Sequence, residues 1–89
     1  MTSRTTKRFR DALSRLPQEV QRQARQAYER FEANPYHASL QFRRVHEVLP
    51  VYSARVGIHY RAAGTFDGDE IVWFWIGTHS EYDHLLTQL

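Results

Sequence analysis

The order of apolar and polar residues predicts a helical N-terminal part of the chain. Apolar residues recur at helical spacing on both sides of Pro17: Phe9, Leu13 and Leu16 before it, and Val20, Ala24, Ala27, Tyr28 and Phe31 after it. Proline is tolerated at the first position of a helix but not inside one, so the pattern predicts two helices that form an antiparallel hairpin. The second helix ends at Asn34-Pro35, because the residue before a proline avoids the helical region. Residues 1–6 fit either a flexible arm or a short edge strand.

After residue 39 the periodicity changes to that of strands. Residues 40–45, 51–57 and 58–62 each alternate apolar with polar side chains, which is typical of a half-buried strand. Asp67-Gly68-Asp69 is a turn signal, and Ile71–Ile76 follows it as six consecutive large apolar residues. A run this short cannot cross a bilayer, which takes about 20 residues, so it is predicted to be a core strand.

A short helix is predicted at the C-terminus. Its apolar stripe is formed by Tyr82, Leu85, Leu86 and Leu89. Thr78 and Glu81 have the spacing of a capping box at its start. The whole order predicts an α+β domain over residues 1–89, with the helical hairpin packed on a mainly antiparallel sheet of about four strands.

Composition narrows the possible chemistry. The chain has 89 residues and no cysteine, which excludes disulfides and thiolate metal sites. No apolar segment of the kind found in secretory signals begins it, so a cytoplasmic location is expected. Lys7 is the only lysine among twelve cations, and arginine is the side chain suited to planar recognition of phosphate. Arginines on the helices are expected to be solvated, which leaves those on strands as candidates for function.

Strand parity places candidate residues on the face away from the helical hairpin. If Tyr52, Ala54, Val56, Tyr60 and Ala62 face the helices, then Ser53, Arg55, His59 and Arg61 face the other way. Arginines on a rigid sheet are suited to binding phosphate, and His79 and Tyr82 after the last strand can move protons.

Simpler roles for these residues remain open. Arg55 and Arg61 can pair with Glu47, Glu70 or Glu81, and His79 can belong only to the helix cap. A polar sheet face can also bind another protein. The five histidines show no metal-binding spacing, so neither a metal site nor a cofactor is expected.

The ordered motifs of the chain resemble a known family. They are Leu16-Pro17-x-x-Val20-Gln21, Asn34-Pro35, Tyr52-Ser53-Ala54-Arg55-Val56-Gly57, Tyr60-Arg61-Ala62 and Trp73-Phe74-Trp75-Ile76-Gly77-x-His79-x-x-Tyr82-Asp83. Together they are similar to the RelE/ParE superfamily of toxins from bacterial type II toxin–antitoxin systems, over roughly residues 6–86. The resemblance implies a RelE-like fold and a cognate antitoxin as partner.

The resemblance also implies an activity. RelE-like members are metal-independent endoribonucleases that cleave mRNA in the ribosomal A site, through attack of a ribose 2′-OH on the adjacent phosphate. By position, it implies catalytic roles for Arg55, Arg61, His79 and Tyr82. It implies that RNA or phosphate is bound by Arg43, Arg44, Arg55, His59 and Arg61.

The chain departs from this pattern at two places. Ser53 stands where the best-known RelE members have a second cation, and Gly77-Thr78-His79 lacks the arginine that usually follows the last strand. ParE-like members share the fold, lack the catalytic set and poison DNA gyrase. Gyrase inhibition and an inactive member that only binds a partner therefore remain alternatives, and no membrane partner is expected.

Overall fold

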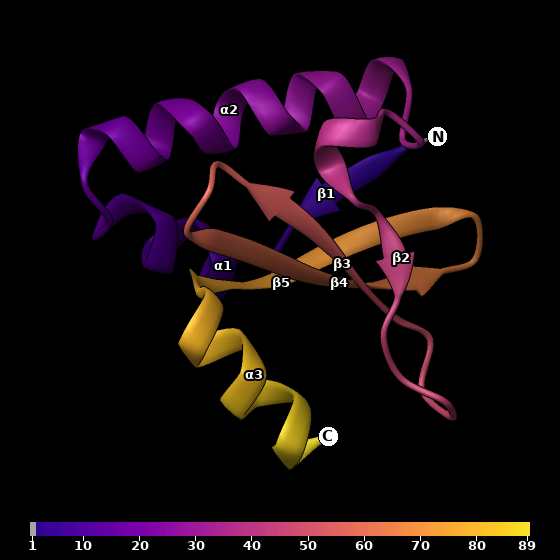
Figure 1. The fold of residues 1–89 in the computed structure, drawn as a ribbon. Coiled ribbons are helices and arrows are strands. Elements are labelled where there is room, and N and C mark those ends of the chain that lie inside the picture. Colours follow the sequence, from indigo (N-terminus) through magenta and orange to yellow (C-terminus); the bar gives the residue numbers. More distant parts are fainter. Residues whose placement is uncertain (1) are drawn as a thin grey trace.

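The computed structural model describes residues 2–89 and contains a five-stranded sheet with helices on both faces (Figure 1). The strands lie in the order β1 (Ser3–Thr5), β5 (Glu70–Thr78), β4 (Tyr60–Asp67), β3 (Val51–Val56) and β2 (Arg43–Arg44). Only the β1–β5 pair is parallel. This confirms the predicted α+β class and the mainly antiparallel sheet, with one strand more than expected.

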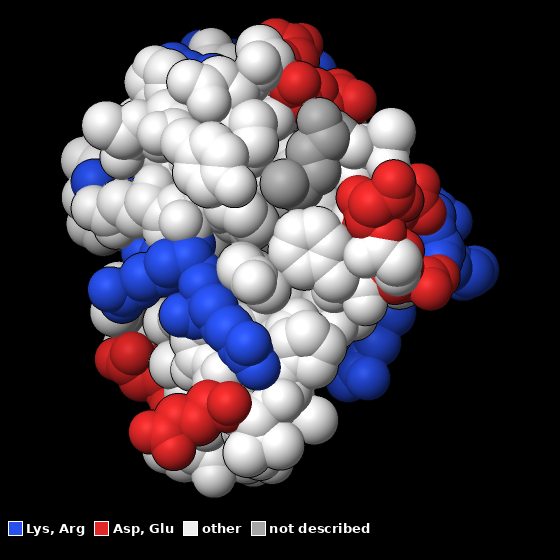
Figure 2. All heavy atoms as spheres, turned by 90° about the vertical axis from the view of Figure 1, so that its right-hand side faces the viewer, with Lys and Arg blue, Asp and Glu red and all other residues white. Residues whose placement is uncertain are grey.

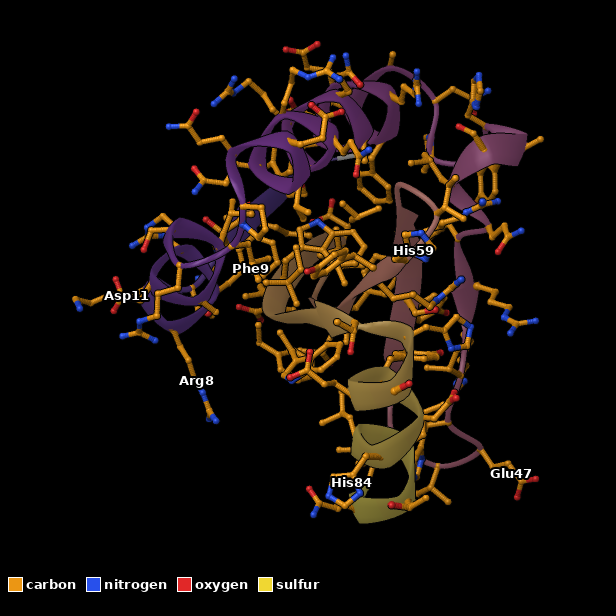
Figure 3. All side chains as sticks on the ribbon, turned by 60° about the vertical axis from the view of Figure 1, so that its left-hand side comes forward. Arg8, Phe9, Asp11, Glu47, His59 and His84 are labelled. Atoms are coloured by element: carbon orange, nitrogen blue, oxygen red, sulfur yellow. The ribbon has the colours of Figure 1, made fainter. Side chains whose placement is uncertain are left out.

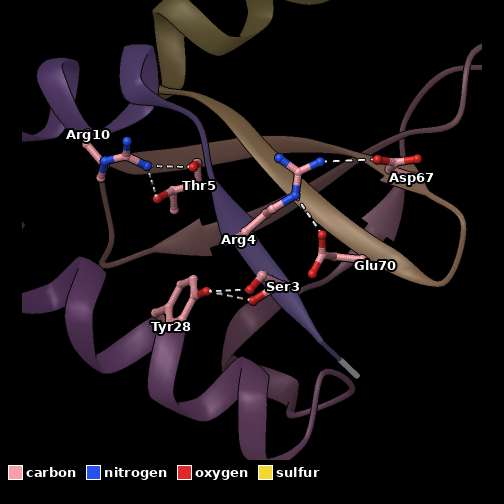
Figure 4. Close-up of polar contacts among 7 residues, drawn as sticks. All are labelled: Ser3, Arg4, Thr5, Arg10, Tyr28, Asp67 and Glu70. Carbon is pink, nitrogen blue, oxygen red and sulfur yellow. Dashed lines mark hydrogen bonds and ion pairs between the residues drawn. The ribbon is translucent and has the colours of Figure 1, made fainter.

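The fifth strand comes from the N-terminal segment, whose sequence is compatible with either a flexible arm or an edge strand. Ser3 pairs with Ile71 of β5, and the Tyr28 hydroxyl donates to the Ser3 carbonyl at 3.0 Å (Figure 4). Arg4 forms ion pairs with Asp67 at 3.1 Å and Glu70 at 2.6 Å. These contacts attach residues 3–5 to the sheet as an edge strand, while Met1 lies outside the described residues.

The two predicted N-terminal helices are both present on one face of the sheet. Helix α1 spans Lys7–Ser14 and α2 spans Gln18–Ala33, and Asn34 is the C-cap of α2. The Thr6 hydroxyl accepts from the backbone N–H of Phe9 at 3.1 Å and so caps α1.

The core between this hairpin and the sheet confirms the predicted strand parity. Buried side chains from both layers form one cluster, listed here by layer: Phe9, Ala24, Ala27 and Phe31 from the helices, and Ala54, Val56, Ala62, Ile71, Trp73 and Ile76 from the strands. Phe31 packs edge-on against Trp73 with ring centroids 5.3 Å apart. The residues that alternate with Ala54 and Ala62 therefore point to the opposite face.

The predicted strand over residues 40–45 is largely wrong. Residues Ala38–Leu40 form a 3₁₀ turn, η1, and β2 contains only two residues. Leu40 is 1% exposed because η1 turns it into the core, and Gln41 has a φ of 47°, which redirects the chain. Alternation over so short a segment does not reveal such a turn.

The strand predicted from residue 58 begins two residues later. Val56 pairs with Tyr60, so residues 57–59 form the β3–β4 turn, with Gly57 at a φ of 62°. Ile58 was expected to face the helices and is instead 72% exposed. His59 likewise lies in the turn and not on the strand.

The apolar strand β5 reaches both faces of the sheet. A register shift between Ala63 and Gly64 places Trp73 opposite Gly64, facing the helical hairpin, and Trp75 opposite Ala63, facing the other way. Trp75 lies near Tyr82 of α3 (His79–Gln88), with ring centroids 6.3 Å apart. Helix α3 thus covers the second face of the sheet (Figure 1). Among residues 2–89, no helix has both the length and the apolar character needed to span a membrane.

Candidate functional site

Arg61 is a buried cation beneath α3. Its Nη1 donates to Gln41 Oε1 at 3.1 Å and its Nη2 donates to Ser53 Oγ at 3.0 Å. The guanidinium carbon lies 5.2 Å from the centre of the Tyr82 ring. The side chain is 5% exposed, and its Nε is buried without a partner.

Ser53 joins this arginine to the helix above it. Its Oγ accepts from Arg61 and also from the Tyr82 hydroxyl, at 3.2 Å, and the residue is 0% exposed. A serine oxygen has two acceptor sites, so both are used here. A second cation at this position would face the Arg61 guanidinium as a like charge in a buried setting. The serine replaces that cation with an acceptor.

Two further arginines flank Arg61 on the same face of the sheet. Arg43 lies opposite Ser53 in the β2–β3 register, and Arg55 lies opposite Arg61 in the β3–β4 register. Burial lowers the pKa of Arg61, the positive charges of Arg43 and Arg55 lower it further, and Tyr82 acts in the opposite direction. All three arginines still carry their charge, since guanidinium groups are not deprotonated in proteins. The face therefore holds a cluster of three positive charges, which we call the arginine cluster.

The alternative that these arginines pair with acidic residues is wrong. Within residues 2–89, neither Arg55 nor Arg61 forms an ion pair. Glu70 pairs with Arg4, and Glu81 completes the capping box with Thr78. The Nε of Arg55 donates to the Gly57 carbonyl at 2.9 Å, which directs this side chain towards the β3–β4 turn.

His79 lies at the edge of the arginine cluster, at the start of α3. Its backbone N–H donates to the His59 carbonyl at 2.9 Å, so both histidines lie where the β3–β4 turn meets the β5–α3 junction. The His79 side chain is 60% exposed, with Nδ1 3.4 Å from the Asp83 carboxylate. Its ring approaches that of Tyr82 edge-on, with centroids 5.9 Å apart. Thr78 and Glu81 make the cap, so the His79 imidazole takes no part in it.

Tyr82 differs from His79 because it is buried. It is 3% exposed, and its hydroxyl points inward to Ser53. In this arrangement Tyr82 covers Arg61.

The structure does not place every predicted residue at this site. Arg44 alternates with Arg43 and donates to the carbonyls of His46 at 3.0 Å and Val48 at 3.2 Å, so it holds the loop before β3. His59 lies at the edge of the arginine cluster, in the β3–β4 turn and not on the strand face where parity placed it. His84, which was not a predicted site residue, lies far along α3 (Figure 3). In residues 2–89, no three His, Asp or Glu side chains group together in a way that could hold a metal ion.

Two residues of the site carried no functional prediction. Gln41 binds Arg61 from the loop before β2, and no periodicity points to it. Strand parity places Ser53 on the correct face and the RelE pattern marks it as a departure, but neither predicts its bond to Arg61. A small polar residue between apolar strand neighbours is a signal for a buried hydrogen bond.

The neighbouring side of the molecule offers no comparable surface. Figure 2 shows the side that carries β2 and the β4–β5 turn. Positive and negative side chains form small groups there, some of them directly beside one another, with uncharged surface between the groups and no continuous positive track. The arginine cluster and the histidines at its edge remain the candidate site.

A helical hairpin on a mainly antiparallel sheet, with a polar opposite face, is the fold of the RelE-like toxins. A chain of the RelB-RelE antitoxin–toxin complex from Methanococcus jannaschii matches with a TM-score of 0.71 and 22% identity, over 90% of this chain and 95% of that chain. A chain of the RelE-RelB complex from Pyrococcus horikoshii OT3 matches with a TM-score of 0.67 and 20% identity, over 86% of this chain and 92% of that one. The YoeB/ParE toxin from Agrobacterium tumefaciens matches with a TM-score of 0.68 and 12% identity, over 89% and 99%.

Sequence comparison defines the family. The model of the ParE-like toxin domain matches residues 18–84, and the chain belongs to this family. Its resemblance to the RelE/ParE superfamily of toxins is thereby confirmed. No curated protein sequence matches the chain.

Proposed function

We propose that this chain is the toxin of a type II toxin–antitoxin module and cleaves mRNA on the ribosome. The observation that carries the proposal is Arg61, a buried cation with no carboxylate partner and an unpartnered Nε, flanked by two more arginines. Burying a cation costs several kcal/mol, and such a cost is typical of sites where negative charge arrives during function. A phosphate passing through a pentacoordinate state brings that charge.

The reaction requires two proton transfers and stabilisation of added charge. The ribose 2′-OH loses its proton as its oxygen bonds to phosphorus, and the bond from phosphorus to the 5′ oxygen then breaks. The leaving oxygen takes up a proton, and the products are a 2′,3′-cyclic phosphate and a 5′-hydroxyl end. Histidine can accept and donate protons near neutral pH, so His79 moves a proton at its imidazole.

The arginine cluster supplies the electrostatic part. Arg43 and Arg55 bind the phosphate at the surface, and Arg61 adds positive charge from below. At a separation of about 6 Å and an effective dielectric of about 20, each unit charge interacts with the phosphorane by about 3 kcal/mol. Groups aimed at developing charge typically contribute about 10²–10³ in rate. Tyr82 keeps Arg61 in place through Ser53 and its own ring face. The further role proposed for Tyr82, orienting the ribose, requires its buried hydroxyl to leave Ser53.

The test is cleavage of mRNA by purified protein added to translating ribosomes, with cuts mapped by primer extension. His79→Ala should reduce the cleavage rate by about 10²–10⁴, the usual contribution of a positioned acid or base. His84→Ala is the matched control, because His84 is an exposed histidine on the same helix and far from the site (Figure 3). Intact mRNA with the wild-type protein would contradict the proposal.

Gyrase inhibition is a second candidate, because the family model that matches the chain is the ParE-like one. A supercoiling assay with purified gyrase separates the two activities. Inhibited supercoiling together with intact mRNA would support this second function, whereas unchanged supercoiling with cleaved mRNA would support the first.

We also propose a cognate antitoxin protein as partner, since two structural relatives are antitoxin–toxin complexes. Induced expression of the chain should arrest growth, and co-expression of the neighbouring open reading frame should relieve the arrest. Growth arrest that persists with this neighbour would contradict the pairing. Action on translating ribosomes implies a cytoplasmic location.

A further inference from the structure

A polar hollow lies between α2, η1 and the β3–β4 turn. Its volume is about 330 Å³, within the range of small-ligand pockets. Polar side chains that line it come from all three elements: Gln23, Gln26 and Arg30 from α2, Ser39 from η1, and Arg55 from β3. Ile58, which is 72% exposed, adds an apolar surface.

The charge of this hollow is positive and unbalanced. Arg30 and Arg55 both line it, no carboxylate does, and neither arginine forms an ion pair with any residue that the structure describes. Guanidinium groups approaching from two elements match the geometry of a phosphate, which accepts paired hydrogen bonds. An anionic ligand therefore fits this hollow better than a neutral one.

Arg55 belongs both to the arginine cluster and to the lining of the hollow. By register, Arg55 projects from the face that holds Arg61, yet its Nε donates to the Gly57 carbonyl at the turn that borders the hollow. Strand β2 pairs only with Tyr52 and Ser53, because the chain leaves the sheet before Arg43. The edge of β3 at Arg55 is consequently not covered by another strand.

We propose that this hollow binds one further nucleotide of the RNA, outside the cleaved bond, with its phosphate held by Arg30, while Arg55 lies between this phosphate and the one bound at the arginine cluster. The single strand passes from the arginine cluster over Arg55 and the β3–β4 turn to α2. The amides of Gln23 and Gln26 are within the same hollow to hydrogen-bond the base or sugar, and Ile58 packs against the base. This assignment rests on the proposed ribonuclease function and adds a binding subsite to it.

Binding of uncleavable RNA of different lengths tests the subsite. The probes are fluorescent 2′-O-methyl oligoribonucleotides, which lack the attacking hydroxyl: a trinucleotide, and two pentanucleotides extended at its 5′ or its 3′ end. One extension should tighten binding to the wild-type chain by about tenfold, as expected for an added hydrogen-bonded charge contact. Arg30→Ala should abolish this gain and reduce the dependence of log K on log salt by about 0.7, the value for one phosphate of a single strand.

Arg25→Ala is the matched control, since it removes the same charge from an exposed position on α2 outside the hollow. It should retain the gain from the longer probe. Equal loss in the two variants, or no gain for either extension with the wild-type chain, would overturn the subsite. If mRNA is cleaved but the longer probes bind no more tightly than the trinucleotide, the subsite is refuted and the proposed cleavage is not. A gain that Arg30→Ala abolishes, with mRNA intact, supports RNA binding in the hollow and contradicts the proposed cleavage.

Discussion

Replacing Arg61 by methionine should stabilise the protein and abolish its activity. Burial of the guanidinium costs several kcal/mol, and its unpartnered Nε adds about 1–3 kcal/mol. Its two hydrogen bonds together stabilise the folded state by about 3 kcal/mol, and the contact with the Tyr82 ring stabilises it by about 1–2 kcal/mol. Methionine places an unbranched apolar side chain in the same space, so the free energy of unfolding of the variant should be higher by about 1–3 kcal/mol.

The hydrogen-bond partners of Arg61 are not left unsatisfied in the methionine variant. Ser53 still accepts from the Tyr82 hydroxyl, and Gln41 is exposed and can bind water. For a domain of this size, 1 kcal/mol shifts the melting temperature by about 4–8 °C, so the midpoint should rise by about 5–15 °C.

Thermal and urea unfolding measure the change in stability of Arg61→Met, and the ribosomal cleavage assay measures its loss of activity. Arg25→Met, at an exposed position, should change stability by less than about 0.5 kcal/mol. Burial lowers the pKa of Arg61, and a base with a lowered folded pKa destabilises the fold at every pH where it stays charged. Since arginine stays charged, the gain should be the same at pH 6 and pH 8. A lower melting temperature for Arg61→Met would refute the reasoning, because the guanidinium would then be a structural group.

Three more predictions concern the fold around the site. Ser53→Ala should destabilise the protein by about 2–4 kcal/mol in urea unfolding, because two buried donors lose their acceptor; an unchanged midpoint would contradict the network. Hydrogen bonds from Thr78 lower the pKa of Glu81, so its capping contribution is complete above the unfolded carboxyl pKa and lost as pH falls through the folded value. The wild-type protein should therefore melt above Glu81→Gln at pH 7 but not at pH 3, and a constant difference would exclude this linkage. Gly57→Ala and Gly68→Ala should each cost about 1 kcal/mol, because both glycines have positive φ and the Cβ added at Gly57 meets only the end of the flexible Gln23 side chain, 2.3 Å from its amide oxygen, which can move aside. A clearly larger loss for Gly57→Ala by calorimetry would contradict this reasoning.

Much of the fold could be predicted from local signals. The spacing of Phe9, Leu13 and Leu16, the position of Pro17 and the Thr78–Glu81 capping box each act within a few residues, and all of them match the structure. Strand parity also placed Arg55 and Arg61 on the face away from the hairpin, because side chains alternate along any extended backbone.

Other features depend on contacts between distant segments. Residues 3–5 become a strand only because β5 offers a free edge, and Leu40 enters a 3₁₀ turn because the core accepts its side chain. Arg44 resembles Arg43 in the sequence, but the loop before β3 provides carbonyls that bind its guanidinium.

The sequence by itself determined the helices, the strand faces, the family and the residue types available for chemistry, since these follow from short-range spacing and ordered motifs. Only the tertiary structure decided that Arg61 is buried, that Ser53 joins it to Tyr82, and that no carboxylate neutralises the arginine cluster. Charge, burial and hydrogen-bond partners depend on which segments meet across the sheet. That packing converts three scattered arginines into one candidate site.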